Sequence, residues 1–183
     1  NGSVALVAAE QATLTINNNN LFDIQIPVGG GTSDANGIVH SGSTGGPVRV
    51  DRNDNHNTYL VAVPKSQAMT MLLGGSIGHT LSATSGDDGQ ILISAGGNIA
   101  NATSFSSTID TTIDPAKNAN ISIGDPAVGG VNFDGHVQAF ANNNLSLTST
   151  AGNDVATNAT NAFNGASFVA GDSIDISVGT GST

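Results

Sequence analysis

Cysteine and tryptophan are absent from this sequence of 183 residues, and basic residues are scarce. The lack of cysteine excludes a disulfide-stapled scaffold and a cysteine-ligated zinc site. Four Lys and Arg residues stand against 14 acidic residues, which gives a formal net charge of −10. Because so few cations cannot neutralise a phosphate backbone, we expect no nucleic-acid partner. No apolar run reaches the roughly 18 residues that a membrane helix needs, so we expect no membrane span.

Charged residues make up only 10% of the chain, whereas about 25% is usual for globular proteins. Gly, Asn, Ser and Thr supply the polarity instead. Asn, Asp and Gly favour turns, and Thr favours strands, whereas the strong helix formers other than Ala are few. The hydrophobic content of 38% is too high, and too regularly arranged, for a disordered chain. The composition therefore favours a folded all-β protein.

Short segments with alternating apolar residues recur along the whole chain, each bounded by Gly, Asn, Asp or Ser. No apolar stripe with helical periodicity and helical length is present. The pattern predicts many short strands. After an initial Val4–Ala8, the segments are Ala12–Ile16, Phe22–Val28, Val48–Val50, Thr58–Val63, Met69–Leu73, Gln90–Ser94, Asn120–Ile123, Val137–Ala141, Leu145–Ser149 and Ser173–Val178.

Several of these segments also resemble one another. Four share the order polar, apolar, variable, apolar, small residue, and their first apolar positions are 91, 121, 145 and 174, which are 30, 24 and 29 residues apart. A second pair, Gly74–Ile77 and Gly96–Ile99, is separated by 22 residues. Repetition at irregular intervals of this size indicates a solenoid whose coils have loops of variable length.

We therefore predict one right-handed parallel β-helix (a β-solenoid) over residues 1–183. Coils stacked about 4.8 Å apart bury a continuous aliphatic column, and Asn side chains at the corners form hydrogen-bonded ladders. At roughly 20–25 residues per coil the chain makes about eight coils. The alternative is an antiparallel β-sandwich, which also has short, evenly spaced strands. The repeated strand motif and the scarcity of large aromatics, with Tyr59 the single tyrosine, favour the β-helix.

The N-terminal half resembles the filamentous-haemagglutinin-like exoproteins of bacterial two-partner secretion. The first strands are similar to that family's "G-x-V-x-L-x-A" strand and the strand after it, and the next coil is similar to its "N-x-G-x-I-x-A-x-G" pattern. The residues that carry the resemblance are Gly2–Glu10, Ala12–Ile16, Asn36–Gly42, Thr58–Pro64 running into Met69–Leu73, and Gln90–Ile99.

The resemblance covers roughly residues 1–100, and beyond them only the general solenoid texture continues. It implies that the chain is a fragment of a large secreted adhesin, exported by an outer-membrane transporter to the surface of a Gram-negative cell. As partners of such a surface segment we expect host cells, extracellular matrix or further copies of the protein. The family's secretion-domain signatures belong before this segment and are not found in it.

The most polar run is Asp51–Asn57, whose D-x-N-x-N start is similar to a calcium-binding loop. The sixth position of such a loop requires Gly and holds His56, and the twelfth requires Glu and holds Ala62. We therefore expect a solvated loop, with a weak Ca²⁺ site as the alternative.

Three pairs of aspartates are candidate carboxylate pairs for glycoside hydrolysis. Asp87 and Asp88 lie in a Gly-bounded turn, and a pair in one tight turn does not span a cleft. Asp110 and Asp114 can share one face of a strand but are then about 13 Å apart, while Asp172 and Asp175 flank Ile174 and point to opposite faces. We expect all three pairs to lie on the surface.

The remaining candidates are also weak. The four histidines show no metal-binding spacing and no Ser/His/Asp signature, so we expect them on the surface or in loops. Two glycine-rich runs lack the Lys and the helix of a phosphate loop and are interpreted as turns. Five glycosylation sequons are expected by chance in such a chain. These residues are His40, His56, His79 and His136, then Gly29–Gly31 and Gly42–Gly46, then Asn1, Asn101, Asn120, Asn144 and Asn158.

The sequence thus predicts a structural or adhesive β-helix segment without catalytic residues, cofactor or metal. A fibre-forming module that stacks end to end is one alternative, because open β-helix ends expose unpaired strand edges. A polysaccharide-active β-helix enzyme is the other. The enzyme is disfavoured because only four Lys and Arg residues are present to act as basic groups. The absence of Trp also removes the usual side chain on which sugar rings stack.

Overall fold

The computed structural model describes residues 3–17, 21–31, 36–45, 57–79, 89–107, 119–150, 153–157 and 166–180. These residues form strands and the turns between them, and none of them is in a helix. The predicted all-β class is therefore confirmed. None of the described residues forms a helix long and apolar enough to cross a membrane.

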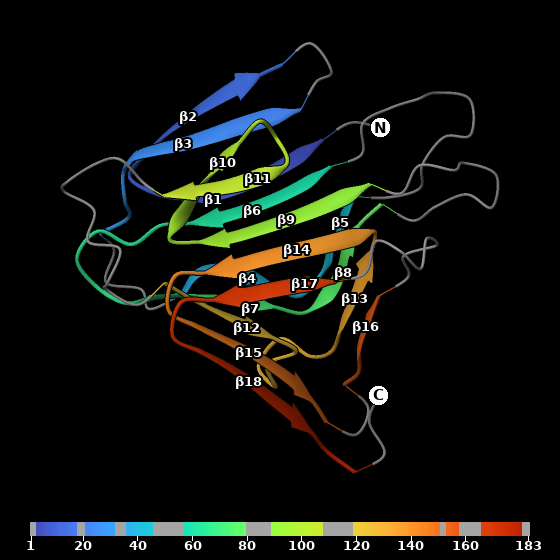
Figure 1. Ribbon diagram of the computed structural model, residues 1–183. Coiled ribbons are helices and arrows are strands. Elements are labelled where there is room, and N and C mark those ends of the chain that lie inside the picture. The colour runs from blue at the N-terminus through green and yellow to red at the C-terminus, as the bar shows by residue number, and fades with distance from the viewer. Residues whose placement is uncertain are drawn as a thin grey trace, which may run out of the picture.

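Three of the four sheets are parallel throughout (Figure 1). Sheet 1 contains β1 (Val4–Ala8), β6 (Thr58–Ala62), β9 (Gln90–Ala95), β14 (His136–Ala141) and β17 (Ser167–Ala170). Sheet 2 contains β4 (Asn36–His40), β7 (Met69–Leu73), β12 (Ala119–Ile123), β15 (Asn144–Ser149) and β18 (Ser173–Val178). Sheet 3 contains β5 (Ser43–Gly45), β8 (Gly75–Gly78), β13 (Val131–Asp134) and β16 (Val155–Thr157).

The chain visits these sheets in a fixed order, from sheet 1 to sheet 2 to sheet 3 and back. We call one such passage a layer and the three sheets together the stack. Hydrogen bonds between layers continue around the corners, where Gly96 N–H donates to the Ala62 carbonyl and Gly124 N–H donates to the Leu73 carbonyl, both at 2.8 Å. Backbone groups at the turns are therefore satisfied by the neighbouring layer, as buried backbone requires.

The parallel pairing aligns equivalent residues into columns that cross the layers. In sheet 1, Leu6, Leu60, Ile93, Ala139 and Phe168 form one column and Ala8, Ala62, Ala95, Ala141 and Ala170 the next. In sheet 2, one column is Ile38, Met71, Ile121, Leu145 and Ile174, and another is His40, Leu73, Ile123, Leu147 and Ile176. Most of these side chains belong to one hydrophobic core enclosed by the three sheets.

A fourth, antiparallel sheet covers the outer face of sheet 1. We call it the lateral sheet, and it contains β2 (Gln11–Ile16), β3 (Phe22–Val28), β10 (Gly97–Ala100) and β11 (Ser104–Ser107). Ile24, Ile26 and Ile99 pack there against the outward side chains Tyr59, Val61 and Leu92 in a second core. Both faces of sheet 1 are consequently buried, which explains why β6 and β9 are almost continuously apolar rather than alternating.

From β12 to β18 the outer face of sheet 2 is polar, and Asn side chains there form the predicted interlayer ladder, which serine hydroxyls extend. Asn143 Nδ2 donates to Asn120 Oδ1 at 2.9 Å, and Ser173 Oγ donates to Asn144 Oδ1 at 3.0 Å in the next layer. Below them Ser146 Oγ donates to Ser122 Oγ at 3.1 Å. The expectation that Asn side chains form interlayer ladders is therefore confirmed at this corner.

Most predicted strands occur with shifts of one residue at their ends, but two details of the predicted repeat are wrong. Ile121, Leu145 and Ile174 stack in sheet 2, whereas Ile91 lies in sheet 1, so the interval of 30 residues is not a layer repeat. Likewise β8 lies in sheet 3 and β10 in the lateral sheet, so the two Gly-Gly motifs are not equivalent. Val48–Val50 lies outside the described residues.

The number of layers also differs from the expected eight or so. Sheets 1 and 2 each hold five strands within the described part of the chain. The chain leaves the stack twice to build the lateral sheet, once between β1 and β4 and once between β9 and β12, and the lateral strands add no layer. The entirely parallel pairing of three sheets is also unlike the antiparallel pairing of a β-sandwich.

Candidate functional site

Several candidate residues from the sequence lie outside the described part of the chain. These are Asp51 to His56 of the calcium-like loop, Asp87 and Asp88, and Asp110 and Asp114. The last residue of the loop, Asn57, is described and is buried. Its Oδ1 accepts a hydrogen bond from Gln90 N–H at 3.2 Å and its Nδ2 donates to the Tyr59 hydroxyl at 3.1 Å. Asn57 thus links two layers of the stack.

Asp172 and Asp175 are exposed, as expected. Asp172 lies at the corner between β17 and β18, where its N–H donates to the Asn143 carbonyl. Asp175 lies in β18, in the outward column with Ser146 and Ser122. The two carboxylates therefore occupy a corner and an outer sheet face of the described structure.

The expectation that the histidines lie on the surface or in loops is wrong for His40, which is buried within β4. His79 is also buried, but it follows β8 and lies outside a strand. His40 follows Ile38 by two residues on β4 and so faces the same side of the strand. Its Nδ1 donates to the Gly74 carbonyl at 2.7 Å and its Nε2 bonds with the Thr44 hydroxyl, so the ring ties sheet 2 to sheet 3. Among the described residues no three His, Asp or Glu side chains are close enough to hold a metal ion.

A polar cluster on sheet 3 was not predicted. Asp134 is buried at the end of β13, where its carboxylate accepts from Ser76 Oγ at 2.7 Å and from Asn132 Nδ2 at 2.8 Å. Alternation could have revealed it, because Asn132 and Asp134 are two residues apart on one strand. The contacts join adjacent layers, so we assign the cluster to the structure of the stack.

Tyr59 is the most perturbed ionisable group described. Burial between sheet 1 and the lateral sheet raises the pKa of its hydroxyl, and the nearby charge of Asp23 also raises it. Hydrogen bonds from Asn57 Nδ2 and from Phe22 N–H lower the pKa in part, because both stabilise the phenolate. The net upward direction means that the second core favours the neutral tyrosine.

We expect the protein to lose stability when the pH rises above about 10, the ordinary pKa of tyrosine. The unfolded chain loses the phenolic proton there while the folded chain retains it, so the free energy of unfolding falls as pH increases. Urea unfolding between pH 8 and pH 11 measures the slope. The matched control is Tyr59→Phe, which should show a shallower slope. Equal slopes would contradict the assignment. Because Tyr59 is the single tyrosine, its absorbance titration reports the raised pKa directly.

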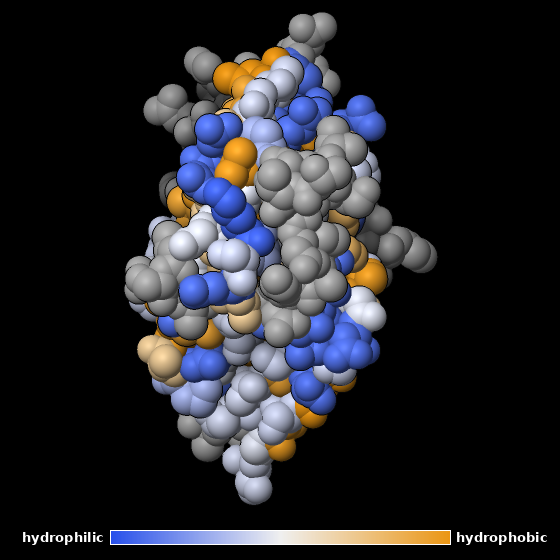
Figure 2. All heavy atoms as spheres, turned by 90° about the vertical axis from the view of Figure 1, so that its left-hand side faces the viewer, coloured by the Kyte–Doolittle hydropathy of each residue, from blue (hydrophilic) through white to orange (hydrophobic). Residues whose placement is uncertain are grey.

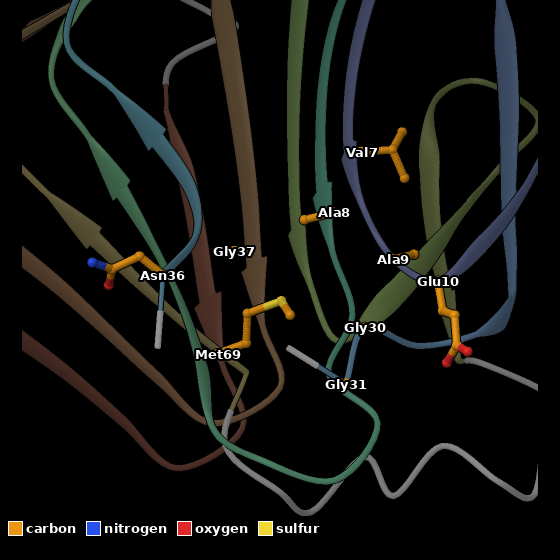
Figure 3. Close-up of a pocket in the computed structure, with 9 residues that line it drawn as sticks. All are labelled: Val7, Ala8, Ala9, Glu10, Gly30, Gly31, Asn36, Gly37 and Met69. Carbon is orange, nitrogen blue, oxygen red and sulfur yellow. The ribbon is translucent and has the colours of Figure 1, made fainter. Parts of the chain in front are cut away.

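A cavity of about 430 Å³ lies between the end of β1 and the start of β4. Its wall is formed by small residues, and Figure 3 shows the Met69 side chain projecting toward its centre while Asn36 and Glu10 point away. The Glu10 carboxylate is bound to Lys65 Nζ at 2.8 Å on the surface. The lining residues are Val7, Ala8, Ala9, Glu10, Gly30, Gly31, Asn36, Gly37 and Met69. The volume is that of a ligand site, but convergent polar groups are few.

A second cavity of about 420 Å³ lies on the lateral sheet, and most of its lining residues are polar. Its lining includes Asp23, Asn98 and Asn101. Asp23 Oδ1 accepts from Ala102 N–H at 2.7 Å, and Asn98 Oδ1 accepts from Ile26 N–H at 2.9 Å. These polar atoms are used in joining β3 to the β10–β11 hairpin, so the cavity shows no paired acid and base.

The most distinctive surfaces are the two ends of the stack. We call β1, β4 and β5 the proximal edge and β16, β17 and β18 the distal edge, because each strand pairs on one side only among the described strands. Large apolar side chains are exposed there: Leu14, Ile16 and Val39 near the proximal edge, and Val169, Ile174, Ile176 and Val178 at the distal edge. Figure 2 shows hydrophobic surface at the top and along the lower margin, at the heights of β2 and β18 in Figure 1.

Comparison of the chain with protein-family models, with curated proteins and with solved structures found no significant match in any of the three. The similarity to two-partner-secretion exoproteins therefore stays a prediction from the sequence motifs.

Proposed function

We propose that this chain is a structural segment of a secreted or cell-surface bacterial exoprotein, folded as one right-handed parallel β-helix whose loops make adhesive contacts. The observation that supports this most is the strand path, which returns to the same three sheets in the same order through successive layers. Right-handed crossovers between parallel strands are preferred in about 98% of cases, which is the basis for the proposed hand.

A scaffold role follows from how the layers are joined. Ladder hydrogen bonds connect every layer to the next in sheets 1 and 2, and the aliphatic columns fill the space between the sheets. Any bending of the stack has to break several of these bonds together. The polar outer face of β12, β15 and β18 and the net charge of −10 keep such a rod soluble outside the cell. Export through an outer-membrane transporter is part of the proposal and is based on the sequence resemblance.

Adhesion of coated beads tests the adhesive role. Beads carrying the purified chain are expected to be retained on cultured epithelial cells or on fibronectin or collagen surfaces, in a saturable way that soluble chain inhibits. Beads carrying heat-unfolded chain are the matched control, because they have the same charge and composition. Equal retention of folded and unfolded chain, or none on any surface, would overturn the adhesive role.

An activity assay tests the absence of catalysis. The chain is incubated with polygalacturonate and with neutral glucans, and new reducing ends and unsaturated products are measured. We expect no turnover above that of the heat-unfolded chain. Turnover by the folded chain alone would contradict the proposal and favour a polysaccharide-active enzyme, with the polar cavity around Asp23 as the first region to mutate.

A further inference from the structure

The distal edge exposes side chains that belong to core columns. Ile176 is 70% exposed, whereas Leu73 and Ile123 in the same column are 0% exposed. Ile174 is likewise exposed although Leu145, its partner in the layer before, is buried. The inward side chains of β18 thus have the apolar pattern of an interior strand. A strand added beside β18 would cover Ile174 and Ile176 in the same way that β18 covers the equivalent side chains of β15.

The proximal edge carries a complementary feature, an overhang formed by β2. Leu14 pairs with Ile24 and Ile16 with Phe22, and residues directly opposite on antiparallel strands share a face. Ile24 is fully buried against sheet 1, yet Leu14 is 46% and Ile16 63% exposed on that same face. Figure 1 places β2 at the top of the molecule, above the level of β1, so its apolar face extends past the last strand of sheet 1.

We infer that a second copy of this chain docks head to tail, adding its β17 to β1 beneath the β2 overhang and its β18 to β4. This continues the interface that already joins the layers. In unbroken register Phe168 would lie beside Leu6, and Ala170 beside Ala8, as those columns run inside one chain. The outward Val169, which is 51% exposed, would then face β2. This inference rests on the proposed function, because both depend on the strand path through the three sheets. It adds a second copy of the chain as a binding partner.

A second copy fits these edges because the requirements are specific. The occupant must present parallel strands to sheets 1 and 2 at once, with an outward apolar residue for the overhang, and the distal edge of the same chain has all of these. Electrostatics oppose the contact, since exposed Asp172 and Asp175 approach an edge that carries Glu10 on a chain of net charge −10. Association is therefore expected to strengthen with salt, as the Debye length falls to about 10 Å at 0.1 M.

Sedimentation at rising protein and salt concentration is the first test. We expect monomer in dilute, low-salt solution and open-ended oligomers at higher concentration, because a head-to-tail contact does not close. A monomer under every condition would overturn the inference.

Complementation of two blocked variants distinguishes head-to-tail docking from other contacts. Ile16→Lys places a charge on the proximal overhang and Val169→Lys one on the distal edge, at exposed positions that do not carry the fold. Each variant alone is expected to stay monomeric, and their equimolar mixture to form a dimer and nothing larger. Self-association of Ile16→Lys alone indicates tail-to-tail contact, and that of Val169→Lys alone indicates contact through β2 or the proximal edge. Either result would contradict the inference.

Val39 offers a gain-of-function test of the register. It is exposed on β4 in the column that continues through Leu72, Ser122 and Ser146 to Asp175, so docking brings Asp175 of the second copy beside it. Val39→Lys should strengthen association roughly two- to five-fold, the effect of one cross-strand ion pair. Val39→Asp is the matched control and should weaken association. The same direction of change for both would refute the register. Bead adhesion by the blocked monomers separates this inference from the adhesive role.

Discussion

Ile123→Ala should lower the free energy of unfolding by roughly 2–5 kcal/mol, the range for removing most of a buried aliphatic side chain. Ile123 is fully buried in β12, where the side chains of Leu73 and Leu147 lie beside it in the neighbouring layers. The interior cannot close around the lost atoms, because the backbone on both sides is fixed by ladder hydrogen bonds. The midpoint of urea unfolding, measured in dilute low-salt solution, reports the loss.

The control is the same substitution two layers away in the same column. Ile176 occupies the equivalent position of β18 but is 70% exposed, so Ile176→Ala should change the free energy of unfolding by no more than about 0.5 kcal/mol. Chemistry, strand position and neighbouring column are matched, and only the covering layer differs. Similar losses for both variants would mean that a layer beyond β18 already covers Ile176 in solution, as the proposed docking requires at higher concentration.

Strand positions and the all-β class could be predicted because each strand carries its own pattern. Buried and partly exposed side chains alternate along Met69–Leu73 and Ala119–Ile123, because one face of sheet 2 packs on the core and the other faces solvent. The repeat that relates one layer to the next could be predicted from the sequence only in part. Ile121, Leu145 and Ile174 stack as their similarity suggests, but Ile91 has the same local pattern in another sheet, since a short amphipathic strand does not encode which sheet it joins.

The lateral sheet could not be predicted in the same way. Gly97–Ala100 resembles a strand of the stack, and only its antiparallel pairing with β11 and β3 sets it apart. One available signal was the unbroken apolar run of β6, because burial of both faces requires a cover on the outside of sheet 1. The burial of His40 could also have been predicted, because His40 lies two residues from Ile38 and so shares its face of the strand. The exposure of apolar side chains at the two edges depends on which described strands pair on one side only. The local sequence pattern of a strand does not carry that information.

Glycine at the corners is the other strong constraint on the stack. Gly124 has a φ of 73°, in the left-handed region that L side chains rarely adopt, and its N–H donates to the Leu73 carbonyl. A Cβ there would also overlap the Thr148 carbonyl oxygen of the next layer. Gly124→Ala should therefore combine backbone strain of about 1–2 kcal/mol with a further 1–3 kcal/mol or so from overlap.

Gly129→Ala separates these two costs. Gly129 has a similar φ of 84°, but the nearest atom to an added Cβ is Asn153 Oδ1 at 3.9 Å, an ordinary contact. This variant should lose only the strain, about 1–2 kcal/mol, while Gly124→Ala loses about 2–5 kcal/mol and lowers the melting temperature by roughly 5–15 °C. Because both glycines share the unusual φ, the difference between the two variants measures how closely successive layers approach at the corner. A vanishing difference would mean that the layers separate there easily, and a stack that separates at its corners cannot act as a stiff rod.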